Sequence, residues 1–181
     1  MVEVAAFSDS SPLVIFAKLK ALPVPCSILG PIGVPPAVYQ EAVVRGRATG
    51  KPDAILIERA VHEGLLVRYE VDDRETKLAD ELMSVGCALG RGECEAIACG
   101  EAHRIPVMLQ DRKARALAAA RGVRTLYPET VLLYGLLRRK IGLDEYGGML
   151  FGLARLTGMG AAMLVELQDQ ASEIDRILKQ G

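Results

Sequence analysis

Four acidic residues of this chain have neighbours that suit them to chemistry. Asp9 and Asp111 each follow a short apolar stretch, residues 2–7 and 105–109, that is typical of a buried strand. Ligands of an open parallel sheet bind outside the carboxyl ends of its strands, so both aspartates lie where a site is expected. The structural alternative for each is N-capping of the following helix, for which aspartate is favoured.

Glu41 belongs to a predicted helix that starts at a pair of prolines, residues 35 and 36, and runs to about residue 44. Its neighbours three and four residues away are Ala37, Val38, Val44 and Arg45. These mostly apolar neighbours predict that Glu41 points toward the core, where an unpaired carboxylate is costly. A functional role and an ion pair with Arg45, one turn further on, account for the pattern equally well.

Glu93 opens a predicted helix over residues 93–103, within the segment Gly-Glu-Cys-Glu-Ala-Ile-Ala-Cys-Gly that ends at Gly100. The small and apolar residues around nearly the whole helix predict that it is buried. Glu93 shares one face with small apolar residues, whereas Glu95 points toward another face. A first-turn acid that suits the helix dipole is the structural alternative for Glu93, but it does not explain the apolar surroundings.

Four carboxylates in one place would repel one another, which raises their pKa values and destabilises the fold. A hard cation removes that cost, and Mg²⁺ and Mn²⁺ prefer oxygen ligands. Two such ions roughly 4 Å apart can activate a water and stabilise the leaving oxygen when a phosphodiester is hydrolysed. If the four acids meet, the pattern therefore indicates metal-dependent phosphodiester hydrolysis.

Composition narrows the class of protein. The 181 residues are enough for one domain with a small appendage, and the net charge of −1 gives no overall attraction to nucleic acid. A zinc site is disfavoured because the chain has two histidines and no C-x-x-C pair. No signal peptide and no membrane-spanning stretch is recognisable, so a reducing cytoplasm is expected. The four cysteines are Cys26, Cys87, Cys94 and Cys99, of which the last two are expected to be small core residues.

The predicted elements alternate between strands and helices, which indicates a parallel sheet covered by helices on both faces. The strands are expected at residues 2–7, 32–34, 65–69, 105–109 and 123–126. Ser11 is expected to cap a helix over residues 13–20, whereas residues 21–31 and 45–51 are expected to be connections. Beyond residue 142 no strand is predicted, so residues 141–181 form a helical extension that packs on the core or pairs two subunits. The other helices are expected at residues 36–44, 52–62, 73–83, 93–103, 111–121, 128–140, 143–156 and 161–180.

The acidic residues also lie in segments that resemble a known family. Four segments are similar to the successive motifs of PIN-domain nucleases: Asp9-Ser-Ser-Pro-Leu13, Val34-Pro-Pro-Ala-Val-Tyr-Gln-Glu41, Leu89-Gly-Arg-Gly-Glu-Cys-Glu-Ala-Ile97 and Leu109-Gln-Asp-Arg-Lys-Ala-Arg115. The resemblance is greatest to a branch of prokaryotic proteins related to the VapC toxins. It covers roughly the first 140 residues, which makes residues 1–140 the expected nuclease domain.

The resemblance implies a three-layer α/β/α sandwich and RNA cleavage that depends on Mg²⁺ or Mn²⁺. It also implies a homodimer and a toxin–antitoxin pair, in which an antitoxin segment blocks the acidic groove. Carried over residue by residue, it assigns catalytic and metal-binding roles to Asp9, Glu41, Glu93 and Asp111, with a supporting hydroxyl at Ser11. The family's third acid has a small residue seven positions later, and Glu95 satisfies that spacing as well as Glu93 does. In this chain Gln110 stands where many relatives carry a further aspartate.

Two questions stay open at this point. Arg112 and Arg115 follow Asp111 and are weak candidates for contacts with RNA phosphates, although a solvated helix face explains them too. The alternative to a ribonuclease is a catalytically idle PIN-like module that acts through protein contacts of the helical extension. A phosphotransfer role for Asp9 ranks last, because no second aspartate stands two residues after it.

Overall fold

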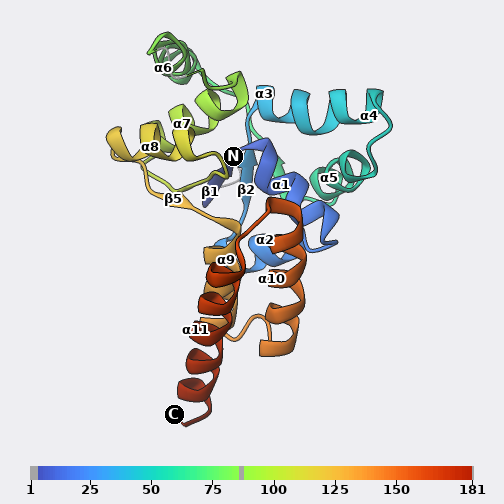
Figure 1. The fold of residues 1–181 in the computed structure, drawn as a ribbon. Helices are drawn as coiled ribbons and strands as arrows, with labels where there is room; N and C mark the ends of the chain where they lie inside the picture. Colours follow the sequence, from blue (N-terminus) through green and yellow to red (C-terminus); the bar gives the residue numbers. More distant parts are fainter. Residues whose placement is uncertain (1–3, 86–87, 181) are drawn as a thin grey trace.

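The computed structural model describes residues 4–85 and 88–180 (Figure 1). They form a five-stranded parallel sheet in the order β3-β2-β1-β4-β5, which confirms the predicted parallel sheet. Phe7 of the central strand pairs with Gly33 on one side and Val107 on the other. The strands are β1 (Ala6–Ser8), β2 (Ile32–Val34), β3 (Leu66–Arg68), β4 (Val107–Met108) and β5 (Thr125–Leu126). Residues 2–3 of the expected first strand and Cys87 lie outside the described residues.

Helices cover both faces of the sheet, as expected for a three-layer α/β/α sandwich (Figure 1). Val107 of β4 and Leu109, just after β4, belong to one buried cluster of side chains. Met108, between them, belongs to the cluster on the opposite face. The cluster of Val107 includes side chains of α6 (Asp73–Ser84), α7 (Arg91–His103) and α8 (Arg112–Ala120). The cluster of Met108 includes side chains of α1 (Ser10–Lys18), α2 (Pro23–Leu29), α5 (Pro52–His62) and α9 (Pro128–Leu137).

The strand order makes the carboxyl ends of β1 and β4 suitable for a binding site. From β1 the chain moves outward through β2 and β3, and then returns to place β4 and β5 on the other side of β1. The reversal lies between β1 and β4, and ligands of open α/β sheets bind at such a switch point. Asp9 follows β1 directly and Asp111 follows β4 after two residues, so the two aspartates flank the reversal.

Two expectations about the first helices are wrong. Residues 21–31 are not a loop throughout, because α2 (Pro23–Leu29) forms there. Its two prolines, Pro23 and Pro25, stand in the first turn, where backbone N–H groups have no partner within the helix. Asp9 rather than Ser11 caps α1, which begins at Ser10 and has a proline in its own first turn.

The helix that carries Glu41 differs most from the expectation. It runs without a break through α3 (Pro36–Tyr39), the π-helical segment η1 (Gln40–Arg45) and α4 (Gly46–Ala48), so residues 45–48 are helical rather than a connection. Ala42 and Val43 are buried, whereas Glu41 is exposed. A π-helix closes i→i+5 hydrogen bonds, so a residue five positions after Val38 returns to the same side of the helix. Val43 therefore faces the core together with Ala42. The prediction that Glu41 points toward the core is therefore wrong.

The two C-terminal helices, α10 (Leu143–Thr157) and α11 (Ala161–Gln180), pack against α9 and against each other (Figure 1). Tyr146, Leu150 and Ala171 are fully buried, and the Tyr146 hydroxyl donates a hydrogen bond to the Leu167 carbonyl at 3.3 Å. Gly152 brings α10 close to α1, since a Cβ atom there would lie 2.5 Å from Leu19 Cδ2. No helix in the described part of the chain combines the length and apolarity needed to cross a bilayer.

Candidate active site

Asp9 is the most deeply buried of the four predicted site residues, with 3% of its surface exposed. Its backbone N–H donates to the Met108 carbonyl at 3.0 Å, which extends the pairing of β1 with β4. Its Oδ2 accepts the Ser11 N–H at 3.3 Å and thereby caps α1. Its Oδ1 is buried and has no hydrogen-bond partner in the described structure. A buried carboxylate oxygen without a partner is costly, so Asp9 is not explained by helix capping alone.

Glu93 and Asp111 also cap helices, and each does so through a single carboxylate oxygen. Glu93 Oε2 accepts the Gly90 N–H at 2.8 Å, at the start of α7. Asp111 Oδ1 accepts the N–H groups of Lys113 and Ala114 at 2.7 and 2.9 Å, at the start of α8. These bonds fix the direction of each carboxylate and leave its second oxygen outside the capping bonds. The structural alternatives proposed from the sequence therefore exist, and they do not exclude a second role.

Glu41 approaches Asp9 across a small space that Gly92 leaves open. A Cβ atom at Gly92 would lie 3.4 Å from Glu41 Oε2 and 3.5 Å from Asp9 Oδ1. The partnerless oxygen of Asp9 and an oxygen of Glu41 therefore border the same small space. Glu41 forms no ion pair with Arg45 in the described residues, so the structural alternative for Glu41 is not observed.

The negative charges of the other three predicted site residues act on Glu93. Burial raises the pKa of Glu93, and the negative charges of Asp9, Asp111 and Glu41 raise it further against the hydrogen bond from Gly90. Burial also raises the pKa of Asp9; the nearby donor groups of Ser10 and Ser11 lower this pKa, and the negative charge of Glu41 raises it. We call the group of Asp9, Glu41, Glu93 and Asp111 the acidic cluster.

Glu95, the alternative to Glu93, lies outside the acidic cluster and has both oxygens engaged. Its Oε2 accepts the Ala37 N–H at 2.8 Å, and its Oε1 pairs with Arg91 Nε at 2.9 Å. Arg91 pairs in turn with Asp80 of α6. Glu95 therefore connects α7 to the first turn of α3 and to α6, which accounts for a buried carboxylate without any ligand.

The two arginines predicted to contact RNA differ from each other. Arg115 donates from Nη1 to the Gln110 carbonyl at 2.6 Å, and its guanidinium carbon lies 4.3 Å from the centre of the Tyr127 ring. Arg115 thus holds the segment that follows β4. Arg112 is exposed at the start of α8, and its contact with RNA stays a prediction.

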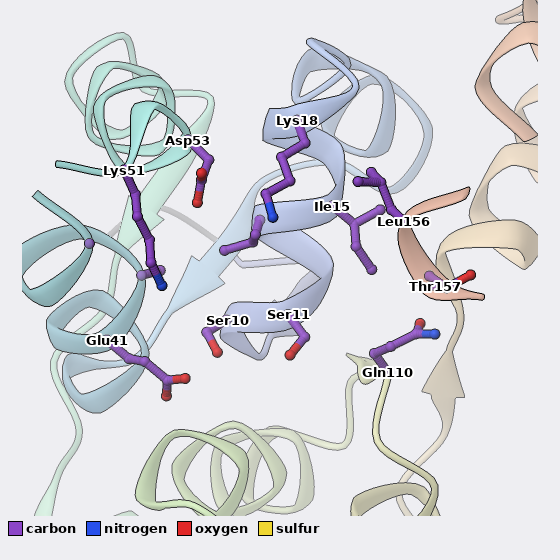
Figure 2. A pocket seen from close by; sticks show the side chains of 13 residues that line it. Ser10, Ser11, Ile15, Lys18, Glu41, Lys51, Asp53, Gln110, Leu156 and Thr157 are labelled. Atoms are coloured by element: carbon purple, nitrogen blue, oxygen red, sulfur yellow. The ribbon is translucent and has the colours of Figure 1, made fainter. Parts of the chain in front are cut away.

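A groove of about 360 Å³ adjoins the acidic cluster (Figure 2). Glu41 belongs to both, and Ser10 and Ser11 line the groove directly after Asp9. Lys18 of α1 and Lys51, which precedes α5, point into it (Figure 2). The remaining lining residues are Val14, Ile15, Ala42, Gly46, Asp53 and Gln110, together with Leu156 and Thr157 at the end of α10.

Sequence reasoning missed the two lysines of the groove. Lys18 had a usable signal, because it stands seven residues after Ser11 and so returns to the same helix face after two turns. Lys51 had none, since its place depends on how α5 packs against the helix that carries Glu41. The sequence marks Gln110 only as a departure from the family pattern, and its buried Oε1 has no hydrogen-bond partner in the described structure.

Comparison with protein families matches residues 5–144 to the PIN domain. The chain belongs to the PIN-domain family. The match covers all five strands and ends just inside α10, so most of α10 and all of α11 lie beyond it. A search of curated proteins found no match.

The PIN domain is a nuclease fold that typically binds a divalent metal, and the donors of the acidic cluster suit such an ion. All of them are carboxylate oxygens, and Asp9 Oδ1 has no competing hydrogen bond. As they stand in the structure, the described residues include no group of three acidic, histidine or cysteine side chains that could hold a metal ion. The carboxylates of Glu93 and Asp111 accept their capping hydrogen bonds through one oxygen and keep the other for further contacts.

Proposed function

We propose that this protein is a Mg²⁺- or Mn²⁺-dependent ribonuclease that hydrolyses RNA phosphodiester bonds at the acidic cluster. The main support for the proposal is Asp9 Oδ1, a buried oxygen without a hydrogen-bond partner in the described structure. It borders the same small space as Glu41, and the charge of Asp9 acts on Glu93. A fold stabilised only by its own contacts gains nothing from such an arrangement, because both burial and repulsion are unfavourable. A bound cation would pair with the buried charge and remove the repulsion between the carboxylates.

Asp9, Glu41, Glu93 and Asp111 would hold the ion. A bound Mg²⁺ or Mn²⁺ supplies a water of lowered pKa and neutralises charge on the phosphate. Within the chain, the Ser11 N–H holds Oδ2 of Asp9, so Oδ1 remains directed toward the acidic cluster. The N–H groups that bind Glu93 and Asp111 limit the rotation of these carboxylates before any ligand arrives, and such preorganisation reduces the cost of binding.

The test is cleavage of a labelled single-stranded RNA by the purified protein with Mn²⁺ or Mg²⁺. We expect cleavage that EDTA abolishes. Asp9→Asn should reduce the cleavage rate by at least roughly 100-fold, because loss of a residue that only supports a metal ligand already reduces metal affinity or activity by about 10–100-fold. Glu70→Gln is the matched control, since Glu70 is an exposed acid outside the acidic cluster. Full activity of Asp9→Asn would contradict the assignment.

We further propose that the protein is a toxin of the VapC-like kind, acting in the cytoplasm as a homodimer with an antitoxin that covers the acidic cluster. The family membership and the motif resemblance support this role. Expression in a bacterial host should then inhibit growth, and Asp9→Asn should relieve the inhibition. Inhibition that persists in Asp9→Asn would contradict the toxin role.

The second candidate, a catalytically idle interaction module, is favoured by exposed apolar side chains on the C-terminal helices. Phe151, Val165 and Ile177 are each more than half exposed. Calorimetry with Mn²⁺ separates the two functions, because the idle module should release or absorb no binding heat while the ribonuclease should lose its binding heat in Asp9→Asn. A stable dimer without Mn²⁺ binding would favour the idle module.

A further inference from the structure

The groove beside the acidic cluster has the composition of a nucleotide site. Its volume of about 360 Å³ lies within the ~300–1,000 Å³ of pockets that hold small organic groups. One part of its wall is apolar, formed by Val14, Ile15 and Leu156, and another carries two lysines. A nucleotide combines the same two properties, since it has an apolar base face and a charged phosphate.

The two lysines are available for an anion. Lys18 and Lys51 are both exposed and form no ion pair within the described residues, although Glu41 and Asp53 line the same groove. Figure 2 shows both side chains pointing into the groove from different elements. A lysine ammonium acts as a compact point charge and is a common phosphate ligand. The pair would attract phosphates that flank the acidic cluster.

Part of the groove wall comes from the C-terminal extension. Leu156 and Thr157 end α10, beyond the residues that match the PIN domain. The close approach of Gly152 to Leu19 holds α10 against α1, and the Thr157 hydroxyl donates to the Leu153 carbonyl at 2.9 Å. The extension of this chain therefore does more than cover the core, because it also narrows the groove.

Gln110 adds a polar group that lacks a partner. Its Oε1 is buried without a hydrogen bond in the described structure, and Arg115 holds its backbone carbonyl at 2.6 Å. An acceptor in this position can take a hydrogen bond from a hydroxyl or amino group of a bound nucleotide. Buried hydrogen-bond acceptors usually have a partner. A donor group of a bound ligand would explain why Gln110 Oε1 has none in the described structure.

We propose that α1, Lys51 and the end of α10 form a channel that takes one nucleotide of single-stranded RNA next to the scissile phosphate. This inference rests on the proposed ribonuclease function. An unstacked base can lie against Val14, Ile15 and Leu156 while Lys18 and Lys51 bind its phosphates. A base that remains paired in a duplex cannot enter the channel.

The first experiment measures RNA binding without cleavage. The Asp9→Asn protein is kept in EDTA, and its binding to a fluorescein-labelled single-stranded RNA is followed by anisotropy over a series of KCl concentrations. Loss of two phosphate contacts in Lys18→Ala/Lys51→Ala should reduce the slope of log K against log[salt] by about 1.4, since each contact on a single strand contributes about 0.7. Lys77→Ala, which alters an exposed lysine of α6 outside the groove, should leave the slope unchanged.

The second experiment tests the wall contributed by α10. Leu156→Trp should fill the channel and weaken binding of the single strand by roughly tenfold. Phe151→Trp is the matched control, because Phe151 is exposed on the same helix but does not line the groove. A duplex of the same sequence should bind more weakly, and Leu156→Trp should not change that binding. Thermal melting of each variant verifies that it is folded.

The outcomes separate the channel from the proposed function. If both altered proteins bind single-stranded RNA as their controls do, or if duplex RNA binds equally well, the channel is overturned. Cleavage by the wild-type protein is measured separately. RNA binding that depends on Lys18, Lys51 and Leu156 without any cleavage would contradict the ribonuclease and retain the channel as an RNA site.

Discussion

Two buried carboxylates in this molecule have opposite surroundings. Asp9, at the end of β1, has one oxygen without a partner in the described structure and lies beside other acids. Glu75 of α6 is 1% exposed, and both of its oxygens have partners. Its Oε1 accepts the Tyr69 hydroxyl and lies 2.8 Å from His103 Nε2, and its Oε2 accepts the Asp72 N–H at 2.8 Å.

The difference between the two acids shows how a structural carboxylate can be told from a functional one. Glu75 completes a capping box with Asp72 and connects α6 to Tyr69, after β3, and to His103 of α7. These bonds offset the cost of its burial within the chain. The N-cap bond of Asp9 offsets only part of its cost, and the remainder needs a partner from outside. Burial alone therefore does not indicate function, whereas burial with an unused oxygen does.

The largest effect expected from this contrast is loss of stability in Glu75→Ala. Removal of this carboxylate leaves the Asp72 N–H without its partner and opens a cavity. The Tyr69 hydroxyl loses one of its two contacts and keeps the one to His103. The free energy of unfolding should fall by about 3 kcal/mol, as is usual for a broken buried network. Urea unfolding followed by circular dichroism measures it. Glu75→Gln keeps the size of the side chain and should lose less; equal losses would show that charge, not packing and hydrogen bonding, dominates.

Addition of Mn²⁺ should stabilise the protein through the acidic cluster that contains Asp9, and not through Glu75. Mn²⁺ at a hundredfold excess over its Kd should raise the free energy of unfolding by about 2.7 kcal/mol, as for any ligand of the folded state. The gain should vanish in Asp9→Asn and shrink in Gly92→Ala, whose methyl group would occupy the space between Asp9 and Glu41. Thermal melting with and without Mn²⁺ provides the measurement. Glu75→Gln is the control and should keep the full gain.

Without metal, Asp9→Asn should be more stable than the wild type. Asparagine is as good an N-cap as aspartate, and the substitution removes a buried charge that other acids repel. The expected gain is about 1 kcal/mol in the free energy of unfolding, typical of a stabilising change at a functional site. Melting in EDTA measures it. A decrease in stability would mean that the Asp9 charge has a partner within the fold.

The smallest expected effect is a pH dependence of the metal-free protein. Burial raises the pKa of Asp9 above its value in the unfolded chain, so the folded state retains the proton to higher pH. The stabilisation from that proton is complete below the unfolded pKa and is lost as pH rises through the raised pKa of the folded state. The difference in melting temperature between wild type and Asp9→Asn, measured in EDTA across the acidic range, should therefore widen with pH. A constant difference would contradict the assignment.

Most of the fold could be predicted from the sequence because it follows from local patterns. Short apolar stretches between amphipathic helices indicate the parallel sheet, and the predicted bounds of β2 agree with the structure. The apolar stretches around β3, β4 and β5 are longer than the strands that form within them. The sequence does not indicate α2, because prolines 23 and 25 suggest a loop, although prolines are compatible with the first turn of a helix.

The surroundings of the four predicted site residues could not be predicted from the sequence. The exposure of Glu41 depends on a π-helical segment, and no residue pattern in 40–45 indicates it. The hydrogen bond from the Ala37 N–H to Glu95 joins residues 58 positions apart in the chain, so the spacing around Glu95 does not indicate it. Lys51 reaches the groove only because α5 packs beside η1. Each of these features depends on tertiary contacts that local spacing does not encode.

The π-helical segment has a consequence for how the chain can change in length. Each residue of an α-helix turns the helix by about 100°. One additional residue within a turn therefore changes the direction in which all the following side chains point. Deletion of one residue between Val38 and Gly46 would restore regular α-helical pitch and rotate one end of the helix against the other. Either Glu41 would turn away from Asp9, or Gly46 would lose its close contact with Ala54. The length of this segment thus couples the direction of Glu41 to the packing of α5, and the segment should tolerate substitution more readily than deletion.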